Sequence, residues 1–207
     1  MSGFVSVVAD WATSMMNALG SPGAGLANAL DSIFPILPSE VVLPVAGFAA
    51  SRGELGLAAV IVWTTIGSVA GSLVVYGAGA WLGRDRVRAL AARMPLVKTA
   101  DVDRAEAWFA RHGGKTVLLG RMLPVFRVLI SVPAGVERMP LVRFIGYTAI
   151  GSAVWNTVFV VAGYSLGEHW ERVEAYGSLL SKAVIAMVAA AVIVFVAVRL
   201  RRPARRG

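Results

Sequence analysis

The sequence predicts an all-α polytopic membrane protein in which two re-entrant hairpins and long transmembrane helices form an inverted repeat. Three observations predict this class. Of the 207 residues, 57% are hydrophobic and 15% are charged, whereas soluble domains have about 45–50% apolar and about 25% charged residues. Two long stretches contain no charged side chain, and two other apolar stretches contain both prolines and charges. This apolar excess is too large for one soluble core of this size.

Composition also excludes other classes of protein. The chain contains no cysteine, which excludes a disulfide-stapled scaffold, and its apolar content excludes a disordered chain. The formal net charge is +8. A basic balance can indicate a nucleic-acid partner, but in a membrane protein basic residues first report topology.

The charge-free stretches, 55–83 and 144–167, each exceed the roughly 20 residues that cross the hydrocarbon core of a bilayer. We expect both to be transmembrane helices. A last span is expected over 177–199, where Lys182 can extend its ammonium group to the interface. The N-terminal helix, 1–20, either crosses the membrane or lies on its surface, and a Gly-Ser-Pro-Gly sequence follows it.

Two further stretches, 26–51 and 116–139, are apolar but unsuited to simple spans. Each contains charged residues and prolines, which are tolerated at membrane depth only where protein or water satisfies the backbone. We therefore expect two re-entrant hairpins. The residues expected to shape them are Pro38, Pro44 and Gly47 in the first and Pro124, Pro133 and Gly135 in the second.

The charges of the connecting segments predict the orientation. The segment 84–114 is basic and includes an expected amphipathic surface helix over 101–112. The C-terminal tail, 200–207, is also basic, whereas 168–174 is net acidic. The positive-inside rule then places both basic segments, and with them the C-terminus, in the cytoplasm. Topology accounts for most of the net charge, so we expect no nucleic-acid partner.

An internal repeat is suggested by aligning the chain with itself. An offset of 84 residues matches Ile66-Gly67-Ser68 with Ile150-Gly151-Ser152, and further identities follow along both spans. The repeat units are 22–83 and 115–167, each a hairpin followed by a span. Such a unit crosses the membrane an odd number of times, so the second copy must be inverted. Inverted repeats with broken segments at the midplane are typical of secondary transporters.

Charged residues in the two hairpins are the candidate functional groups. Glu40 lies in the first, and Arg121 and Arg127 lie in the second. An unpaired charge at bilayer depth costs at least about 2.5–3.5 kcal/mol. One interpretation is that the arginines bind an anionic headgroup such as a phosphate, while Glu40 takes up a proton. The other is that Glu40 pairs with an arginine to close the hairpins, or that the arginines reach the interface.

Other polar residues have simpler expected roles. Asp31, Glu137 and Arg138 are expected near the hairpin mouths. Ser72 and Asn156 lie at equivalent positions of the repeat, where they either pack between helices or line a path. His112 and His169 fall on opposite sides of the membrane, so we expect no metal site. The sequence also contains no motif for a catalytic nucleophile or for ATP binding, and predicts no enzyme.

The motifs resemble the DedA family, also called the VTT or SNARE-associated family. The resemblance is carried by Pro38-Ser39-Glu40 with Pro44 and Gly47, and by Gly120-Arg121-x-x-Pro124-x-x-Arg127 followed by Pro133-Ala134-Gly135. Glu40, Arg121 and Arg127 fall on the family's charged hairpin positions. Many members carry an acidic residue where this chain has Ser72, and this departure argues against a relay of two carboxylates.

The resemblance implies a lipid transporter without a cofactor in the bacterial cytoplasmic membrane. The implied substrate is a polyprenyl phosphate such as undecaprenyl phosphate, moved with protons or sodium as the coupling ion. One alternative is an uncoupled scramblase for phospholipids such as phosphatidylethanolamine. Another is a structural or regulatory membrane protein without transport. The sequence leaves open whether the chain forms a homo-oligomer.

Overall fold

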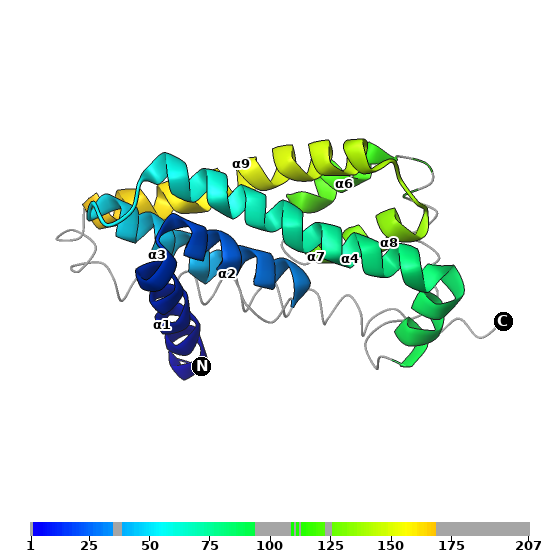
Figure 1. Ribbon diagram of the computed structural model, residues 1–207, viewed down its shortest axis with the longest axis horizontal. Coiled ribbons are helices and arrows are strands. Elements are labelled where there is room, and N and C mark those ends of the chain that lie inside the picture. Colours follow the sequence, from blue (N-terminus) through cyan, green and yellow to red (C-terminus); the bar gives the residue numbers. More distant parts are fainter. Residues whose placement is uncertain are drawn as a thin grey trace, which may run out of the picture. The chain divides into compact units, whose positions relative to one another are not determined.

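The computed structural model describes residues 2–34, 39–93, 109, 111, 113–122 and 126–168, and its described elements are all helices. Two of these helices are long and apolar enough to cross a membrane, over Leu57–Ala89 and Leu141–Gly167. They belong to α4 (Leu57–Arg93) and α9 (Leu141–Glu168), which pack against each other and are the longest ribbons in Figure 1. The two predicted spans are therefore helical.

Short helices surround this pair. Before α4 come α1 (Ser2–Leu19), α2 (Ser21–Ile33) and α3 (Ser39–Ser51). Before α9 come α6 (Gly114–Arg121), α7 (Phe126–Leu129) and α8 (Ser131–Val136). Each expected hairpin thus contains helices, although whether these enter and leave the membrane on one side remains a prediction. The last span, the basic tail, Pro38 and Pro124 lie outside the described residues, as does the expected surface helix except for residues 109 and 111.

Two details differ from the expected elements. The helix α3 continues through Pro44 instead of breaking there, and α4 extends beyond 83 to Arg93. Within α4, Gly83 has a φ of 70°, a left-handed conformation that glycine adopts without steric cost. The chain therefore bends at Gly83 and continues as helix into the segment that was expected to begin a loop.

Small residues let α2 and α4 approach closely. A side chain at Gly67 would collide with the backbone of Gly25, and one at Gly71 would collide with that of Ala29. Close backbone contact of this kind is how helices associate where no hydrophobic driving force acts between them. Gly67 and Gly71 are therefore contact positions between α4 and α2.

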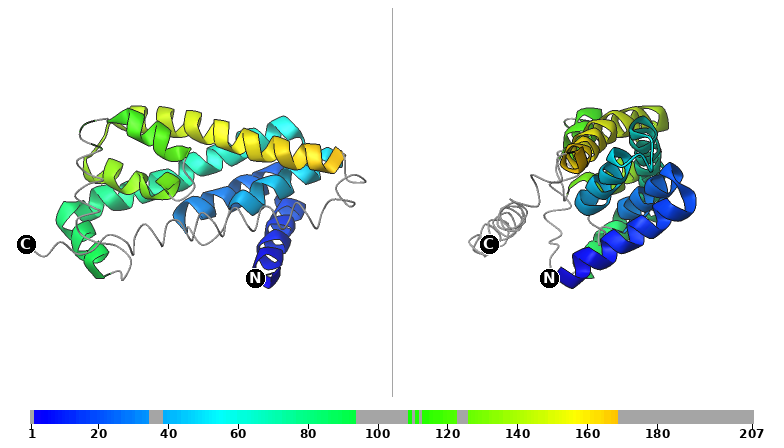
Figure 2. Two further views of the ribbon diagram at one scale, coloured as in Figure 1. Left: turned by 180° about the vertical axis from the view of Figure 1, so that it is seen from behind. Right: turned by 90° about the vertical axis from the view of Figure 1, so that its left-hand side faces the viewer.

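The short helices also pack on the long helix that follows the other hairpin. The helix α3 packs on α9, where Gly47 lies against the backbone of Val160. The helix α8 packs on α4, where Gly135 lies against the backbone of Tyr76. Val160 and Tyr76 are 84 residues apart, which is the offset found in the sequence. Figure 2 shows the described helices from behind and from one end.

The turns that lead into α4 and α9 share one hydrogen-bond pattern. Three backbone N–H groups, of residues 52, 53 and 54, donate to the carbonyls of residues 48, 50 and 49, and 85 residues later the same pattern joins 137, 138 and 139 to 133, 135 and 134. Gly53 has a φ of 78° and Arg138 a φ of 49°. Arg138 therefore adopts, with a full side chain, the left-handed conformation that a glycine takes in the first turn.

Candidate functional site

A buried ion pair joins the first half of the chain to the second. The Arg127 guanidinium on α7 donates from Nη2 to Oδ2 of Asp31 on α2 over 2.5 Å, and both side chains are over 90% buried. The guanidinium carbon of Arg127 also lies 5.7 Å from the ring centre of Trp155 on α9, within cation–π range. The positive charge of Arg127 is therefore compensated in this conformation.

Asp31, which was expected near a hairpin mouth, has its side chain buried in the interior of the protein. Arg127 pairs with Asp31 and not with Glu40. Glu40 is half-buried. The signal that could have identified Asp31 is the helical spacing of Asn28, Asp31 and Ser32, which gives α2 one polar face among alanines and glycines.

Arg121, at the end of α6, is buried without a carboxylate partner among the described residues. Its side chain is 4% exposed. Nη2 donates to the Ser131 hydroxyl over 3.0 Å, and Nε has no hydrogen-bond partner. A buried guanidinium without a carboxylate partner is costly and favours an anion that can accept a hydrogen bond from its free Nε–H group.

Both long helices present buried polar side chains at intervals of four residues. On α4 these are Thr64, Ser68 and Ser72, and on α9 they are Thr148, Ser152 and Asn156, all buried and related in pairs by the 84-residue offset. Ser72 donates to the Ser68 carbonyl within α4, and the Asn156 amide lies 3.4 Å from the Ser68 hydroxyl. The two residues that were candidates for a polar path are thus inside the protein.

Asn28 on α2 forms hydrogen bonds with Thr64 and Ser68 of α4. Its amide nitrogen donates to the Thr64 carbonyl over 2.8 Å and to the Ser68 hydroxyl over 2.7 Å. A carbonyl only accepts, so the amide orientation is fixed and its oxygen faces away from both partners. Asn28 of α2, Thr64, Ser68 and Ser72 of α4 and Asn156 of α9 are therefore connected by hydrogen bonds, with Asp31 one turn further along α2.

The residues expected to shape the hairpins have packing roles. A side chain at Gly163 would collide with the backbone of Pro44, and one at Gly47 or Gly135 would collide with the long helix beneath it. Pro133 accepts the turn hydrogen bond from Glu137 through its carbonyl. These contacts fix α3 and α8 on the long helices, and so position the ends of the hairpins that carry the charged residues.

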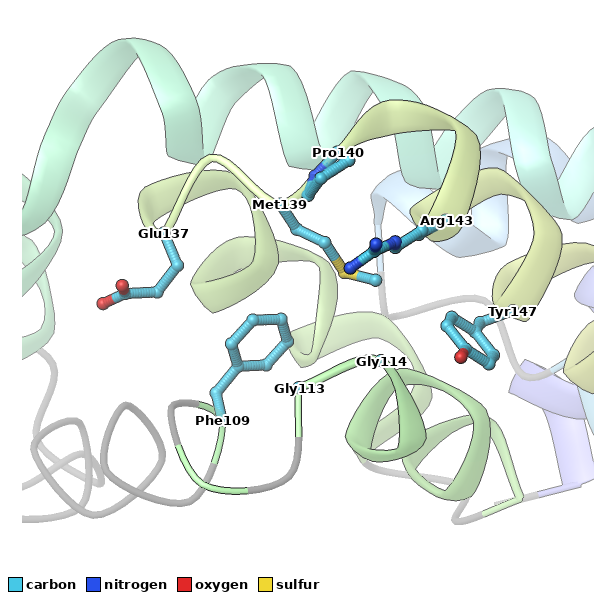
Figure 3. A pocket seen from close by; sticks show the side chains of 8 residues that line it. All are labelled: Phe109, Gly113, Gly114, Glu137, Met139, Pro140, Arg143 and Tyr147. Atoms are coloured by element: carbon cyan, nitrogen blue, oxygen red, sulfur yellow. The ribbon is translucent and has the colours of Figure 1, made fainter.

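A cavity of about 340 Å³ lies beside the α8–α9 turn. Glu137, Met139, Arg143 and Tyr147 contribute side chains to it, and in Figure 3 the Glu137 carboxylate points away from the Arg143 guanidinium. Glu137 and Arg143 are exposed, as was expected for Glu137 at a hairpin mouth. None of Glu40, Arg121 and Arg127 lines this cavity, so the buried charged groups form a separate candidate site.

Comparison with known proteins assigns the family. Residues 37–165 match the VTT domain. The chain belongs to the DedA/VTT family of membrane proteins. Undecaprenyl phosphate transporter A of Bacillus subtilis is 33% identical over 84% of this chain and 83% of its own length. Protein DedA of Escherichia coli is 29% identical over 65% of this chain and 62% of its own.

Relatives in this family carry more than one kind of name. A Lactococcus lactis protein named alkaline phosphatase-like protein is 36% identical over 84% of this chain and 83% of its own length. No solved structure matches the chain with significance. The family assignment confirms the resemblance found in the motifs of the two hairpins and establishes a membrane protein.

Proposed function

We propose that the protein moves a polyprenyl phosphate across the bacterial cytoplasmic membrane, and that Arg121 binds the phosphate. The observation that carries the proposal is the buried Arg121 guanidinium, which has a free Nε and no carboxylate partner in the described part of the chain. A phosphate oxygen matches the forked donors of a guanidinium. Two relatives of this chain are named undecaprenyl phosphate transporter A.

Arg127 is the second phosphate ligand in this proposal, and Asp31 competes for it. In the conformation described here Arg127 is held by Asp31, so a phosphate must displace that carboxylate. A proton on Asp31 or on the neighbouring Glu40 removes negative charge from the cluster and eases the exchange. This supplies a route from proton uptake to substrate binding. Glu40 remains the proposed coupling residue, and Asp31 joins it.

The two halves of the chain, residues 22–83 and 115–167, form an inverted repeat in our proposal. It is supported by the matching turns before α4 and α9, by the paired polar side chains and by the reciprocal packing of α3 and α8. The charged groups belong to both halves, because Asp31 and Glu40 come from the first and both arginines from the second. Relative movement of the halves then opens the site to either side of the membrane.

The remaining parts of the proposal concern location and chemistry. In this proposal the C-terminus is cytoplasmic, which the positive charge of the basic segments supports. The protein transports its substrate without a cofactor and without cleaving it, since the sequence contains no recognisable catalytic nucleophile. The proposed coupling ion is a proton, with sodium as the alternative.

The deciding experiment measures the movement of a long-chain prenyl phosphate between leaflets of liposomes that contain the purified full chain. Arg121→Ala is compared with the wild-type protein and with Arg52→Ala, an arginine that is exposed and paired with Glu54. We expect Arg121→Ala to abolish movement and Arg52→Ala to retain it. Release of inorganic phosphate is measured in the same samples.

Each outcome has a distinct meaning. Movement at the wild-type rate in Arg121→Ala would refute the assignment of Arg121. Equal movement of phosphatidylethanolamine and the prenyl phosphate would indicate a scramblase instead. Stoichiometric release of phosphate would indicate the hydrolytic activity that the name of the L. lactis relative suggests.

A further inference from the structure

The buried polar atoms that lack a hydrogen-bond partner separate into three groups. Among the described residues, the unpartnered N–H donors are Arg121 Nε and Trp155 Nε1, the unpartnered amide oxygens are those of Asn28 and Asn156, and the unpartnered hydroxyls are those of Thr116 and Thr148. Buried polar groups are almost always partnered in folded proteins. A group of unpartnered donors therefore calls for an acceptor, and an anion is the strongest acceptor available.

The two unpartnered donors lie along one face of α9. A side chain at Gly151 would collide with the Cβ and Cγ atoms of Arg121, so Arg121 packs on α9 at this position. Trp155 follows one turn later, and residues four apart share a helix face. The Arg127 guanidinium lies over the ring of Trp155. Two arginines and an indole N–H thus border the same short stretch of α9.

We infer that the Trp155 indole N–H is a further ligand of the phosphate headgroup, beside the guanidinium groups of Arg121 and Arg127. The inference rests on the proposed function, because it takes the anion to be the headgroup of the transported lipid. The face of the Trp155 ring contacts the Arg127 guanidinium. The same ring packs on the ring of Phe159, and the two ring centres are 4.8 Å apart. Neither contact uses Nε1, which leaves that donor for the substrate.

This ligand set consists of donors. The amide nitrogens of Asn28 and Asn156 face the Ser68 hydroxyl, and their unpartnered oxygens face away from it. An amide oxygen is an acceptor and repels an anion, so neither oxygen is a ligand of the phosphate. The indole donor then selects a headgroup that presents an unsubstituted phosphate oxygen, and discriminates against an uncharged alcohol.

Trp155→Phe tests the inference, because it retains the ring and removes only the N–H. The matched control is Trp81→Phe, the same change at a tryptophan of α4 that is 77% exposed. Binding of farnesyl phosphate and of farnesol to the full-length protein in detergent is measured. We expect Trp155→Phe to weaken farnesyl phosphate binding about tenfold or more and leave farnesol binding unchanged. Trp81→Phe should stay within about twofold of the wild type.

A second readout observes the indole directly. The chain contains six tryptophans, and the indole signal of Trp155 in the ¹⁵N-labelled protein is identified by its absence in Trp155→Phe. We expect its proton resonance to move downfield with farnesyl phosphate and not with farnesol. An unmoved signal at saturation, or unchanged affinity of Trp155→Phe, would overturn the inference.

The inference and the proposed function fail in different ways. If Arg121→Ala loses farnesyl phosphate binding and Trp155→Phe does not, the inference is wrong and the proposed function stands. If the wild-type protein binds no farnesyl phosphate, the proposed function is wrong, and titration with inorganic phosphate decides the inference. A shift of the Trp155 signal then supports an anion site at the indole, and an unmoved signal refutes it.

Discussion

Removing one partner of the Asp31–Arg127 pair should destabilise the protein strongly. Both side chains are over 90% buried, and their atoms lie 2.5 Å apart. Loss of one partner of a buried ion pair typically costs about 3–5 kcal/mol, because the other charge stays uncompensated in the interior. We expect Asp31→Asn to lower the free energy of unfolding by about this amount. The double variant Asp31→Asn/Arg127→Gln should recover most of it, since neither charge then remains.

The assay is reversible unfolding in mixed micelles, analysed as a double-mutant cycle. The chain provides its own control in Arg52 and Glu54, whose side chains are 60% and 58% exposed and 3.9 Å apart at their closest atoms. Exposed pairs contribute about 0–1 kcal/mol, so Arg52→Gln should have little effect. If Asp31→Asn costs no more than Arg52→Gln, or if the double variant is no better than the single one, the buried pair does not hold the halves together as we reason.

Three further predictions concern packing, topology and strain. Gly67→Ala should destabilise by about 1–3 kcal/mol through overpacking against α2, whereas Gly77→Ala, with open space beside it, should be neutral or stabilise by up to about 1 kcal/mol; thermal unfolding compares the two. Because the chain has no cysteine, single cysteines at Glu54 and Glu137 can be labelled with a membrane-impermeant maleimide, and an inverted repeat requires that they react from opposite sides. Arg138→Gly should raise the melting temperature, since a left-handed non-glycine residue costs about 1–2 kcal/mol, and an unchanged or lower temperature would show that the Arg138 side chain offsets the strain.

The sequence alone was sufficient to predict the two long helices and to identify Arg121 and Arg127 as candidate functional residues. Charge-free stretches of that length have few alternatives to a transmembrane helix, and an arginine flanked by apolar residues can only be buried or reach the interface. Hydropathy could not decide between these two outcomes. The structure does, because Arg121 and Arg127 are both about 95% buried.

The partner of Arg127 could not be predicted from the sequence, because pairing depends on which helices meet. Glu40 lies in the most recognisable motif, and Asp31 lies in an unremarkable run of small residues. The motif therefore favoured Glu40 as the ion-pair partner of Arg127, whereas the partner is Asp31. The course of α3 through Pro44 was likewise unpredictable from local preference, since proline usually interrupts a helix. The helix α3 nevertheless continues through Pro44, and at this residue it contacts Gly163, which is distant in the sequence.

The reciprocal packing of α3 on α9 and of α8 on α4 means that neither half of the chain can complete its own interior. In a fragment that ends after α4, the surface of α4 that packs on α8 would be uncovered. The helix α3 would lack its packing partner α9. Two such fragments facing in opposite directions could supply one another with the missing contacts. Separately produced halves should therefore be insoluble or dimeric alone, yet reassemble when expressed together, and an ancestor of half this length could have worked only as an antiparallel dimer.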